Sequence, residues 1–244
     1  MRRASSLLIA LVALAPAAEA AECAGTVYLT LDTGNMAQAE DIARVLAAEQ
    51  VRATFFVANE KTRRGDRALD PAWGSYWKAR VVEGHAFGNH TWSHHYAQRD
   101  ERDRIIARSV DGRPVSMDRA AFCAELTRVD AAWEALTGRR LGPMWRAPGG
   151  KTTQQSIRWA GECGFPVHVE WTAAGYVGDD LPSDAHPNAA LLRRALERAA
   201  PGEVLLMHLG VWERREPAAP ILEPLIKGLK ARGLCFQPLR PGTP

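Results

Sequence analysis

The sequence lacks the long apolar runs of a membrane-spanning protein. Nowhere in its 244 residues do about 18 apolar residues follow one another, which excludes a polytopic membrane protein. It also lacks a large excess of charge of either sign: 31 Lys and Arg residues against 28 Asp and Glu residues give a net charge of only +3. Proteins that track phosphates usually have a dense basic face, so we expect no nucleic-acid partner. With 46% hydrophobic residues, the chain has the composition of a globular protein.

Cysteine is scarce, and its spacing excludes a paired C-x-x-C metal site. The four cysteines are widely separated, at Cys23, Cys123, Cys163 and Cys235. In an exported protein we expect them to form disulfides, and four cysteines allow three connectivities. The alternative is four buried free thiols.

The first 20 residues predict a secretory signal peptide. Two arginines precede an apolar stretch over residues 7–15, and Ala18-Glu19-Ala20 supplies an A-x-A cleavage site. The apolar stretch is too short to span a bilayer, so we expect no stable membrane insertion. We predict cleavage after Ala20, a single mature domain over residues 21–244, and a periplasmic or secreted location.

Short β-branched or aromatic runs alternate with amphipathic stretches along the mature chain. The predicted strands cover residues 26–31, 53–57, 85–89, 143–146, 166–171, 204–208 and 234–238. The predicted helices cover residues 36–49, 71–82, 119–136, 153–162, 188–199 and 217–231. Strands that alternate with helices indicate an α/β fold with a parallel sheet, either closed as a barrel or open and doubly wound. Periodicity does not choose between the two.

Residues with catalytic side chains fall at the carboxyl ends of these predicted strands. Asp32 follows the first strand, His90 and His94 follow the third, Arg146 follows the fourth, and His208 ends the sixth. Active sites of parallel α/β folds are built at that edge. We therefore expect these five side chains to lie together.

Each of these side chains has a chemical role and a structural alternative. His90 and His94 are four residues apart and would supply half of a zinc-type site if the segment turns helically, although histidines at this spacing also occur in cores and on surfaces. A buried Asp32 needs a partner such as Arg146, which a purely structural salt bridge would also explain. His208 is a candidate general acid, and a core histidine is its alternative.

Together these residues and their order resemble the polysaccharide deacetylase family, which shares the NodB homology domain. The matching segments are Thr30-Leu31-Asp32-Thr33-Gly34, Gly88-Asn89-His90-Thr91-Trp92-Ser93-His94, Arg146-Ala147-Pro148-Gly149 and Leu206-Met207-His208. The resemblance covers nearly the whole mature chain. It implies a distorted or incomplete (β/α) barrel with about seven parallel strands.

The resemblance also implies a hydrolase that removes an N-acetyl group from an amino sugar. In that chemistry Asp32 is the base, His208 protonates the departing amine, and Arg146 keeps Asp32 ionised. A divalent metal, with zinc expected, is held by His90 and His94. The metal and a backbone N–H near Gly149 stabilise the oxyanion.

The sequence departs from the family pattern at three points. Thr33 stands where the family usually has a second metal-binding aspartate. No fourth-motif aspartate appears around residues 171–176, and Gly149 stands where an aromatic residue is frequent. Candidates for the missing metal ligand are Glu60, Asp179 and Asp180, with a solvated loop charge as the alternative for each. The loop of Asp179 and Asp180 would also tune His208, unless His208 is not tuned at all.

Tryptophan is unusually common, with eight Trp against six Phe and four Tyr. Four of the eight lie in or near the motifs: Trp92, Trp145, Trp171 and Trp212. Because an indole face stacks well on a sugar ring, we predict that they bind substrate together with Gly149. Core packing is the alternative, and it is the expectation for Trp133 and Trp159.

These observations support one leading function and two alternatives. The leading one is a secreted, metal-dependent hydrolase, monomeric in solution, that removes an N-acyl group from a cell-wall or envelope polysaccharide. Thr33 motivates the first alternative, a catalytically silent carbohydrate-binding protein. The second alternative is an amidohydrolase of a small amide.

Overall fold

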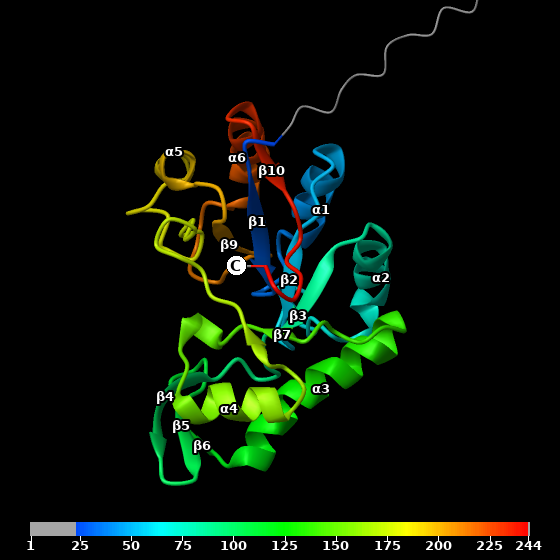
Figure 1. Ribbon diagram of the computed structural model, residues 1–244, viewed down its shortest axis with the longest axis vertical. Helices are drawn as coiled ribbons and strands as arrows, with labels where there is room; N and C mark the ends of the chain where they lie inside the picture. Colours follow the sequence, from blue (N-terminus) through cyan, green and yellow to red (C-terminus); the bar gives the residue numbers. More distant parts are fainter. Residues whose placement is uncertain (1–22, 244) are drawn as a thin grey trace, which may run out of the picture.

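Seven parallel strands form the centre of the fold (Figure 1). In the computed structural model, which describes residues 23–243, their bounds are β1 Gly25–Asp32, β2 Thr54–Val57, β3 Ala86–Asn89, β7 Met144–Trp145, β8 Val167–His168, β9 Val204–His208 and β10 Leu234–Phe236. Each lies within or overlaps a predicted strand. The predicted signal peptide over residues 1–20 lies outside the described residues.

β1 is the strand from which the sheet is organised. Neighbouring strands run in the order β10, β1, β2, β3, β7, β8, and β9 also pairs with β1. The register places Asp32 opposite Phe56 of β2 and His208 of β9. Within residues 23–243, β8 and β9 do not pair as neighbouring strands, so the sheet stays open. The prediction of an α/β fold with about seven parallel strands in an incomplete barrel is confirmed, and no closed barrel forms in the described part of the chain.

Six α-helices connect these strands, each in a segment predicted to be helical. Their bounds are α1 Ala39–Ala48, α2 Gly74–Val82, α3 Arg119–Thr137, α4 Gln154–Glu162, α5 Asn188–Arg198 and α6 Ala219–Ala231, and a 3₁₀ turn, Pro71–Trp73, leads into α2. α6 packs against α1 and α5, whereas α3 packs against α2 and α4. No helix within residues 23–243 is long and apolar enough to cross a membrane.

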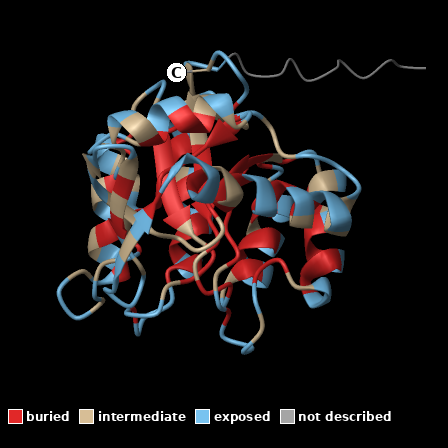
Figure 2. Ribbon diagram, turned by 90° about the horizontal axis from the view of Figure 1, so that it is seen from below, coloured by how far each residue is buried: buried red, intermediate tan, exposed pale blue. Residues whose placement is uncertain are grey.

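Buried residues gather in the strands and on the inner faces of the helices (Figure 2). An aromatic cluster joins β2 and β3 to the helices that cover them. The Trp133 ring of α3 lies 4.4 Å from Phe87 and 5.4 Å from Trp77, between ring centroids. Trp133 and Trp159 are both buried, as predicted. Aromatic pairs at such distances add to the free energy of burial, so this cluster holds α2 and α3 against β3.

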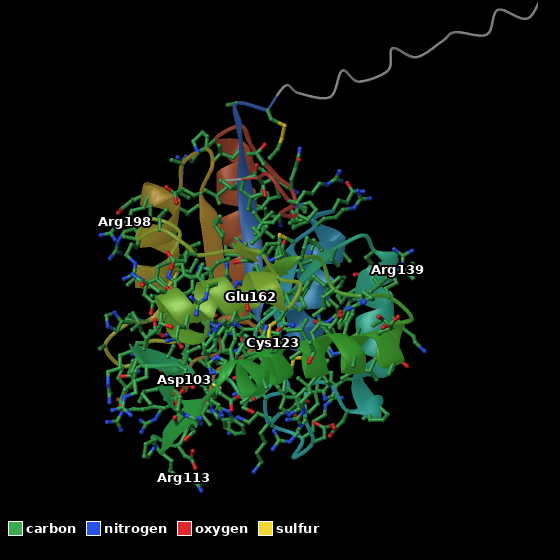
Figure 3. All side chains as sticks on the ribbon, turned by 60° about the horizontal axis from the view of Figure 1, so that its bottom comes forward. Asp103, Arg113, Cys123, Arg139, Glu162 and Arg198 are labelled. Atoms are coloured by element: carbon green, nitrogen blue, oxygen red, sulfur yellow. A yellow bond between two sulfur atoms is a disulfide. The ribbon has the colours of Figure 1, made fainter. Side chains whose placement is uncertain are left out.

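A small antiparallel sheet inserted after β3 was not predicted from the sequence. It consists of β4 Tyr96–Glu101, β5 Arg104–Arg108 and β6 Pro114–Met117, and it lies beside α3 and α4 (Figure 1). Its charged residues interrupt the alternation of apolar and polar residues that marks a strand. Asp103 and Arg113, in the turns between these strands, are exposed on this part of the surface (Figure 3). The insertion matters to the site because β4 begins with Tyr96.

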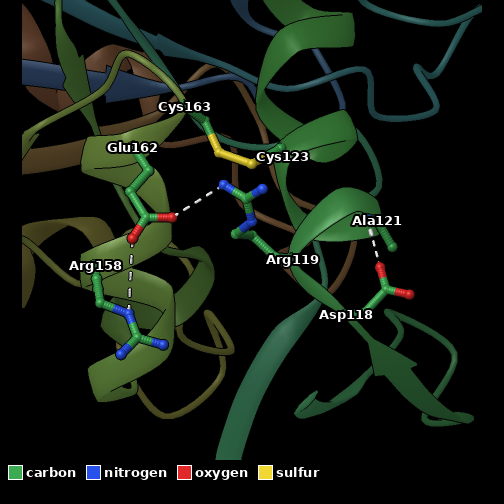
Figure 4. The surroundings of a disulfide bond; sticks show 7 residues. All are labelled: Asp118, Arg119, Ala121, Cys123, Arg158, Glu162 and Cys163. Atoms are coloured by element: carbon green, nitrogen blue, oxygen red, sulfur yellow. Dashed lines mark hydrogen bonds and ion pairs between the residues drawn. A yellow bond between two sulfur atoms is a disulfide. The ribbon is translucent and has the colours of Figure 1, made fainter. Parts of the chain in front are cut away.

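All four cysteines are paired, which confirms the predicted disulfides. Cys23 is bonded to Cys235, so the chain entering β1 is tied to β10. Cys123 is bonded to Cys163, which ties α3 to the end of α4 (Figure 4). The same two helices are joined at the surface by an Arg119–Glu162 ion pair at 3.3 Å. The alternative of four free thiols is therefore wrong.

Removal of the Cys123–Cys163 disulfide should destabilise the protein without changing its fold. The bond spans 40 residues, and cross-links of that length typically contribute about 2–4 kcal/mol through the unfolded state. We expect the Cys123→Ser/Cys163→Ser variant to lose that amount in urea unfolding under non-oxidising, non-reducing conditions. An unchanged midpoint at unchanged slope would contradict the pairing, and Cys23→Ser/Cys235→Ser is the matched comparison.

Candidate active site

A cavity of about 270 Å³ opens at the carboxyl ends of β1, β3 and β9. Four of the five predicted catalytic and metal-binding residues line it: Asp32, His90, His94 and His208. The fifth, Arg146, is completely buried and contacts Asp32. A larger cavity of about 780 Å³ lies near the opposite ends of β2 and β3, and none of the five residues lines it. The structure therefore brings the predicted residues together at the predicted edge of the sheet.

Asp32 and Arg146 form a buried ion pair beneath the cavity. Arg146 Nη1 donates to Asp32 Oδ1 at 2.8 Å and to Thr30 Oγ1 at 2.9 Å. Burial alone would raise the pKa of Asp32, but the Arg146 guanidinium and nearby histidines outweigh it and hold that pKa below its ordinary value. Asp32 is therefore an ionised carboxylate at neutral pH.

Arg146 is fixed in place by more than its partner carboxylate. Its Nε donates to the carbonyl of Val169 at 3.2 Å, and its guanidinium lies 4.2 Å from the Phe56 ring centroid and 5.3 Å from that of Trp171. These contacts hold the planar guanidinium group of Arg146 in one orientation. The charge that orients Asp32 is thus positioned by three segments of the chain: β1, β2 and residues 169–171.

The segment that carries His90 and His94 does not turn helically, so the condition under which their spacing would align them is not met. Residues 90–95 form an irregular bend, with φ of 65° at Thr91 and 53° at His94. The cause lies in α3, where Glu125 accepts hydrogen bonds from the backbone N–H and the hydroxyl of Ser93 at 2.7 and 2.9 Å. The two imidazole rings nevertheless meet, with centroids 4.8 Å apart.

Each of these imidazole rings has one nitrogen that is not bonded to a protein carbonyl group. His90 Nδ1 donates to the Arg146 carbonyl at 2.9 Å, so its Nε2 carries the lone pair and faces Asp32 Oδ2 at 3.4 Å. Burial lowers the pKa of His90 to about 4, which keeps this ring neutral. His94 Nδ1 is buried and has no hydrogen-bond partner within residues 23–243.

This donor set suits a divalent metal by its chemistry. Two imidazoles, one of them held neutral, with carboxylates nearby are ligands that zinc prefers. As the side chains stand, no three His, Cys, Asp or Glu residues in the described part of the chain are spaced to hold a metal ion. The residues fit a divalent metal by their type, and His94 Nδ1, unpartnered among the described residues, is a free ligand atom. Metal binding would require these side chains to move closer together.

His208 is paired with Asp179, which decides between the two alternatives for its tuning. His208 Nδ1 lies 3.1 Å from Asp179 Oδ1, and the His208 backbone N–H donates to Asp179 Oδ2 at 2.7 Å. Burial disfavours the charged ring, yet Asp179 and then Asp32 outweigh it and raise the pKa of His208 to about 10. Asp179 is buried, so the expectation of a solvated loop charge is wrong at this position.

Glu60 is also no solvated loop charge. It lines the cavity, and its Oε2 accepts from the Thr33 hydroxyl at 2.9 Å and from the Gly34 backbone N–H at 2.8 Å. Burial works against ionisation, but His94, His90 and the Thr33 hydroxyl together hold the pKa of Glu60 below its ordinary value. The third candidate, Asp180, is exposed at the rim and pairs with the Tyr176 hydroxyl at 2.5 Å.

The predicted substrate-binding residues divide into two groups. Trp171, Trp212 and Gly149 line the cavity, and Trp212 is 45% exposed at its rim. Trp145 is only 2% exposed and packs against Phe122 in the core, so the structure places it away from the cavity surface. Trp92 is half-buried with the Arg128 guanidinium 4.2 Å from its ring centroid, and it does not line the cavity either.

Tyr96 is a cavity residue that sequence reasoning missed. It also missed His168, which does not line the cavity but contacts the backbone of the third motif. Tyr96 lines the cavity edge-on to His94, with centroids 5.1 Å apart, and a Cβ on Gly149 would lie 3.1 Å from its ring. Tyr96 thus occupies space beside the position where the family often has an aromatic residue. His168 Nε2 accepts from the Ala147 N–H at 3.1 Å, and burial lowers its pKa to about 4. No motif marks either residue, because each depends on contacts with a distant segment.

Arg146→Met should be strongly destabilising because it leaves the Asp32 charge buried without a partner. We expect a loss of about 3–5 kcal/mol in the free energy of unfolding near pH 7. In the wild type, the ion pair contributes to the free energy of unfolding at pH values above the ordinary pKa of an aspartate. This contribution is lost as pH falls through the lowered pKa of Asp32. The difference between variant and wild type should therefore shrink below about pH 4.

The double variant Asp32→Asn/Arg146→Met is the control for this prediction, since it carries neither charge. It should be more stable than Arg146→Met at neutral pH in urea unfolding. A loss that is equal at pH 7 and at low pH would contradict the electrostatic explanation.

Comparison with known proteins agrees with this geometry. A family model described as polysaccharide deacetylase matches residues 20–168. Chitooligosaccharide deacetylase of Azorhizobium caulinodans is 25% identical over 239 residues, which cover 93% of this chain and 98% of that protein.

Two solved structures show the same fold. The family 4 carbohydrate esterase from Streptomyces lividans, in complex with acetate, has a TM-score of 0.67 at 21% identity and covers 91% of this chain and 96% of its own. A family 4 pseudoenzyme from Bacillus anthracis has a TM-score of 0.65 at 18% identity, over 88% of this chain and 64% of its own. The family match spans more than half of the sequence and includes the first three motifs. The protein therefore belongs to the polysaccharide deacetylase family, and deacetylases are hydrolases that act on carbon–nitrogen bonds other than peptide bonds.

Proposed function

We propose that the protein is a secreted or periplasmic deacetylase that removes an N-acetyl or other N-acyl group from an amino sugar of a cell-wall or envelope polysaccharide. The observation that carries this proposal is one cavity lined by an ionised Asp32, the His90 and His94 pair, and a protonated His208. Base, metal-binding residues and acid are the three components that amide hydrolysis needs.

Asp32 is the base in this proposal. Its Oδ1 is bound to Arg146, which leaves Oδ2 on the side of His90. An ionised Oδ2 takes a proton from the attacking water as the water oxygen bonds to the acyl carbon. Arg146 keeps the carboxylate ionised and oriented, so it acts as a positioning residue.

A divalent cation, with zinc expected, would be held by His90 and His94 and would supply a Lewis acid for the water and the amide oxygen. His90 is ready for that role because its Nδ1 is engaged by the Arg146 carbonyl. The same carbonyl belongs to the residue whose side chain holds Asp32. The base and one metal-binding side chain are therefore set by a single residue.

His208 is the acid. Its Nδ1 faces Asp179, so the proton on Nε2 is available to the cavity, and a pKa of about 10 keeps that proton on at neutral pH. When the carbon–nitrogen bond breaks, His208 gives this proton to the leaving amine. The products are a free amino sugar and a carboxylate, acetate in the case of an N-acetyl group.

The rim of the cavity supports a glycan as the substrate. Trp171 and Trp212 line the cavity, and an indole stacks well on the apolar face of a sugar ring. The relatives include a protein named for the deacetylation of chitooligosaccharides. The two disulfides favour an extracytoplasmic compartment.

A catalytically silent glycan-binding protein is the second candidate, because Thr33 replaces a residue that usually binds metal. The fold similarity to a pseudoenzyme does not decide this, since a fold alone carries no activity. What favours an enzyme is that base, acid and both histidines share one cavity.

The proposed function is tested by acetate release from N-acetylglucosamine oligomers by residues 21–244 supplied with zinc. Asp32→Asn removes the base and should lower kcat/KM by about 10²–10⁴-fold. Asp184→Asn, an exposed aspartate outside the cavity, is the control and should leave the rate unchanged. Glycan binding without any release by the wild type would show the silent protein instead.

The pH dependence of the reaction should report the Asp179–His208 pair. Asp179→Asn removes the main cause of the raised His208 pKa, so that pKa should fall from about 10 toward the ordinary 6.5. Because the acid is then deprotonated at mildly alkaline pH, kcat/KM near pH 8.5 should fall by about tenfold or more relative to its value near pH 6.

Nitrogen NMR of the His208 ring measures the same shift directly. Asp180→Asn is the matched control, since Asp180 has a weaker influence on His208 than Asp179 and should move the titration less. An alkaline limit that is identical in wild type and Asp179→Asn would rule out His208 as the acid tuned by Asp179.

A further inference from the structure

The Thr33 side chain bonds to other protein groups rather than serving as the carboxylate ligand that the family usually has at this position. The Thr33 hydroxyl accepts from the Ala58 backbone N–H at 3.0 Å and donates to Glu60 Oε2 at 2.9 Å. Both partners lie just beyond β2. The only proton of the hydroxyl is thus used in holding the Glu60 side chain, and Thr33 is buried.

Glu60 is anchored through one carboxylate oxygen only. Its hydrogen bonds within residues 23–243, from Thr33 and from the Gly34 N–H, both go to Oε2. Oε1 makes none of them, and the carboxylate lines the same cavity as His90 and His94. A carboxylate that is fixed by one oxygen and free at the other is suited to bind a cation.

The length of the Glu60 side chain agrees with that role. Glutamate has one more methylene than aspartate, so it can reach toward the two histidines from the neighbouring strand end. Two imidazoles and one glutamate form a ligand set that zinc uses in catalytic sites.

We propose that Glu60 is the third protein ligand of the divalent cation, together with His90 and His94, and replaces the aspartate that the family usually has at position 33. This inference rests on the proposed function and concerns the same cavity. Thr33 and Gly34 then act as positioning groups for Glu60. Since no three ligand side chains in residues 23–243 are yet spaced for a metal, binding includes an inward movement of these side chains.

Calorimetric titration of the metal-free mature protein with zinc tests the proposal without reference to activity. The wild type should bind one zinc ion. Glu60→Gln keeps the size and the hydrogen bonds to Thr33 and Gly34 but loses the charge, and it should weaken zinc binding by about 100-fold or more, since even indirect partners of a metal ligand are worth about 10–100-fold. Glu213→Gln, at the rim of the same cavity, is the matched control and should bind as the wild type does.

Two further variants keep the test decisive if Glu60→Gln folds poorly. Thr33→Val removes the hydroxyl that holds Glu60 and should weaken zinc binding by about 10-fold or more. Thr33→Asp/Glu60→Gln places a carboxylate at the usual family position and should recover most of the lost affinity. Visible absorption of bound cobalt reports the same changes in coordination.

The possible outcomes separate this inference from the proposed function. Equal zinc affinity in wild type and Glu60→Gln, or no zinc binding by the wild type, overturns the role of Glu60. Acetate release by the wild type would leave the proposed function standing in the first case. Zinc binding that depends on Glu60 without any acetate release would instead support the metal site and refute the activity.

Discussion

The buried ion pair between Asp32 and Arg146 is the interaction on which the candidate site depends. A carboxylate at the end of the central strand would be protonated by burial alone, and the guanidinium reverses that tendency. Arg146 in turn needs Val169, Phe56 and Trp171 to hold its orientation. Its backbone carbonyl also sets the tautomer of His90. One residue of the third motif therefore controls both the base and a metal-binding side chain.

The departures from the family pattern are accompanied by substitutes elsewhere in the chain. Where Thr33 replaces a carboxylate, Glu60 places one in the same cavity, held by Thr33 itself. Where the fourth-motif aspartate is missing, Asp179 contacts His208. Tyr96 lies against Gly149, beside the position where an aromatic residue is frequent. Carboxylates and an aromatic ring thus lie near the three changed motif positions, which favours an active enzyme over one that has lost its activity.

Much of the fold could be predicted from the sequence because local signals agree with the final structure. The apolar run of β9 and the amphipathic segment of α3 have nearly the predicted bounds. The sheet β4–β6 was missed because its charged residues hide the strand pattern. The irregular bend after β3 was not predicted, since nothing near Ser93 in sequence reveals that Glu125 will bind it.

The site could be predicted only as far as its motifs extend. Asp32, His90, His94 and His208 were found because strand ends meet at one edge of the sheet. The cavity position of Glu60 and the burial of Asp179 were not foreseen, because each depends on a partner about 27 to 29 residues away. Trp145 lies in the core rather than at the cavity, and the sequence around a tryptophan does not tell these two positions apart.

The central claim is that Asp32 is ionised at the edge of the sheet because Arg146 holds it so. Carbon NMR of the Asp32 carboxyl, followed against pH in the mature protein, measures this most directly. The predicted result is a titration below the ordinary aspartate pKa of about 3.9. A titration at or above that value would contradict the account, since burial would then have prevailed over the ion pair.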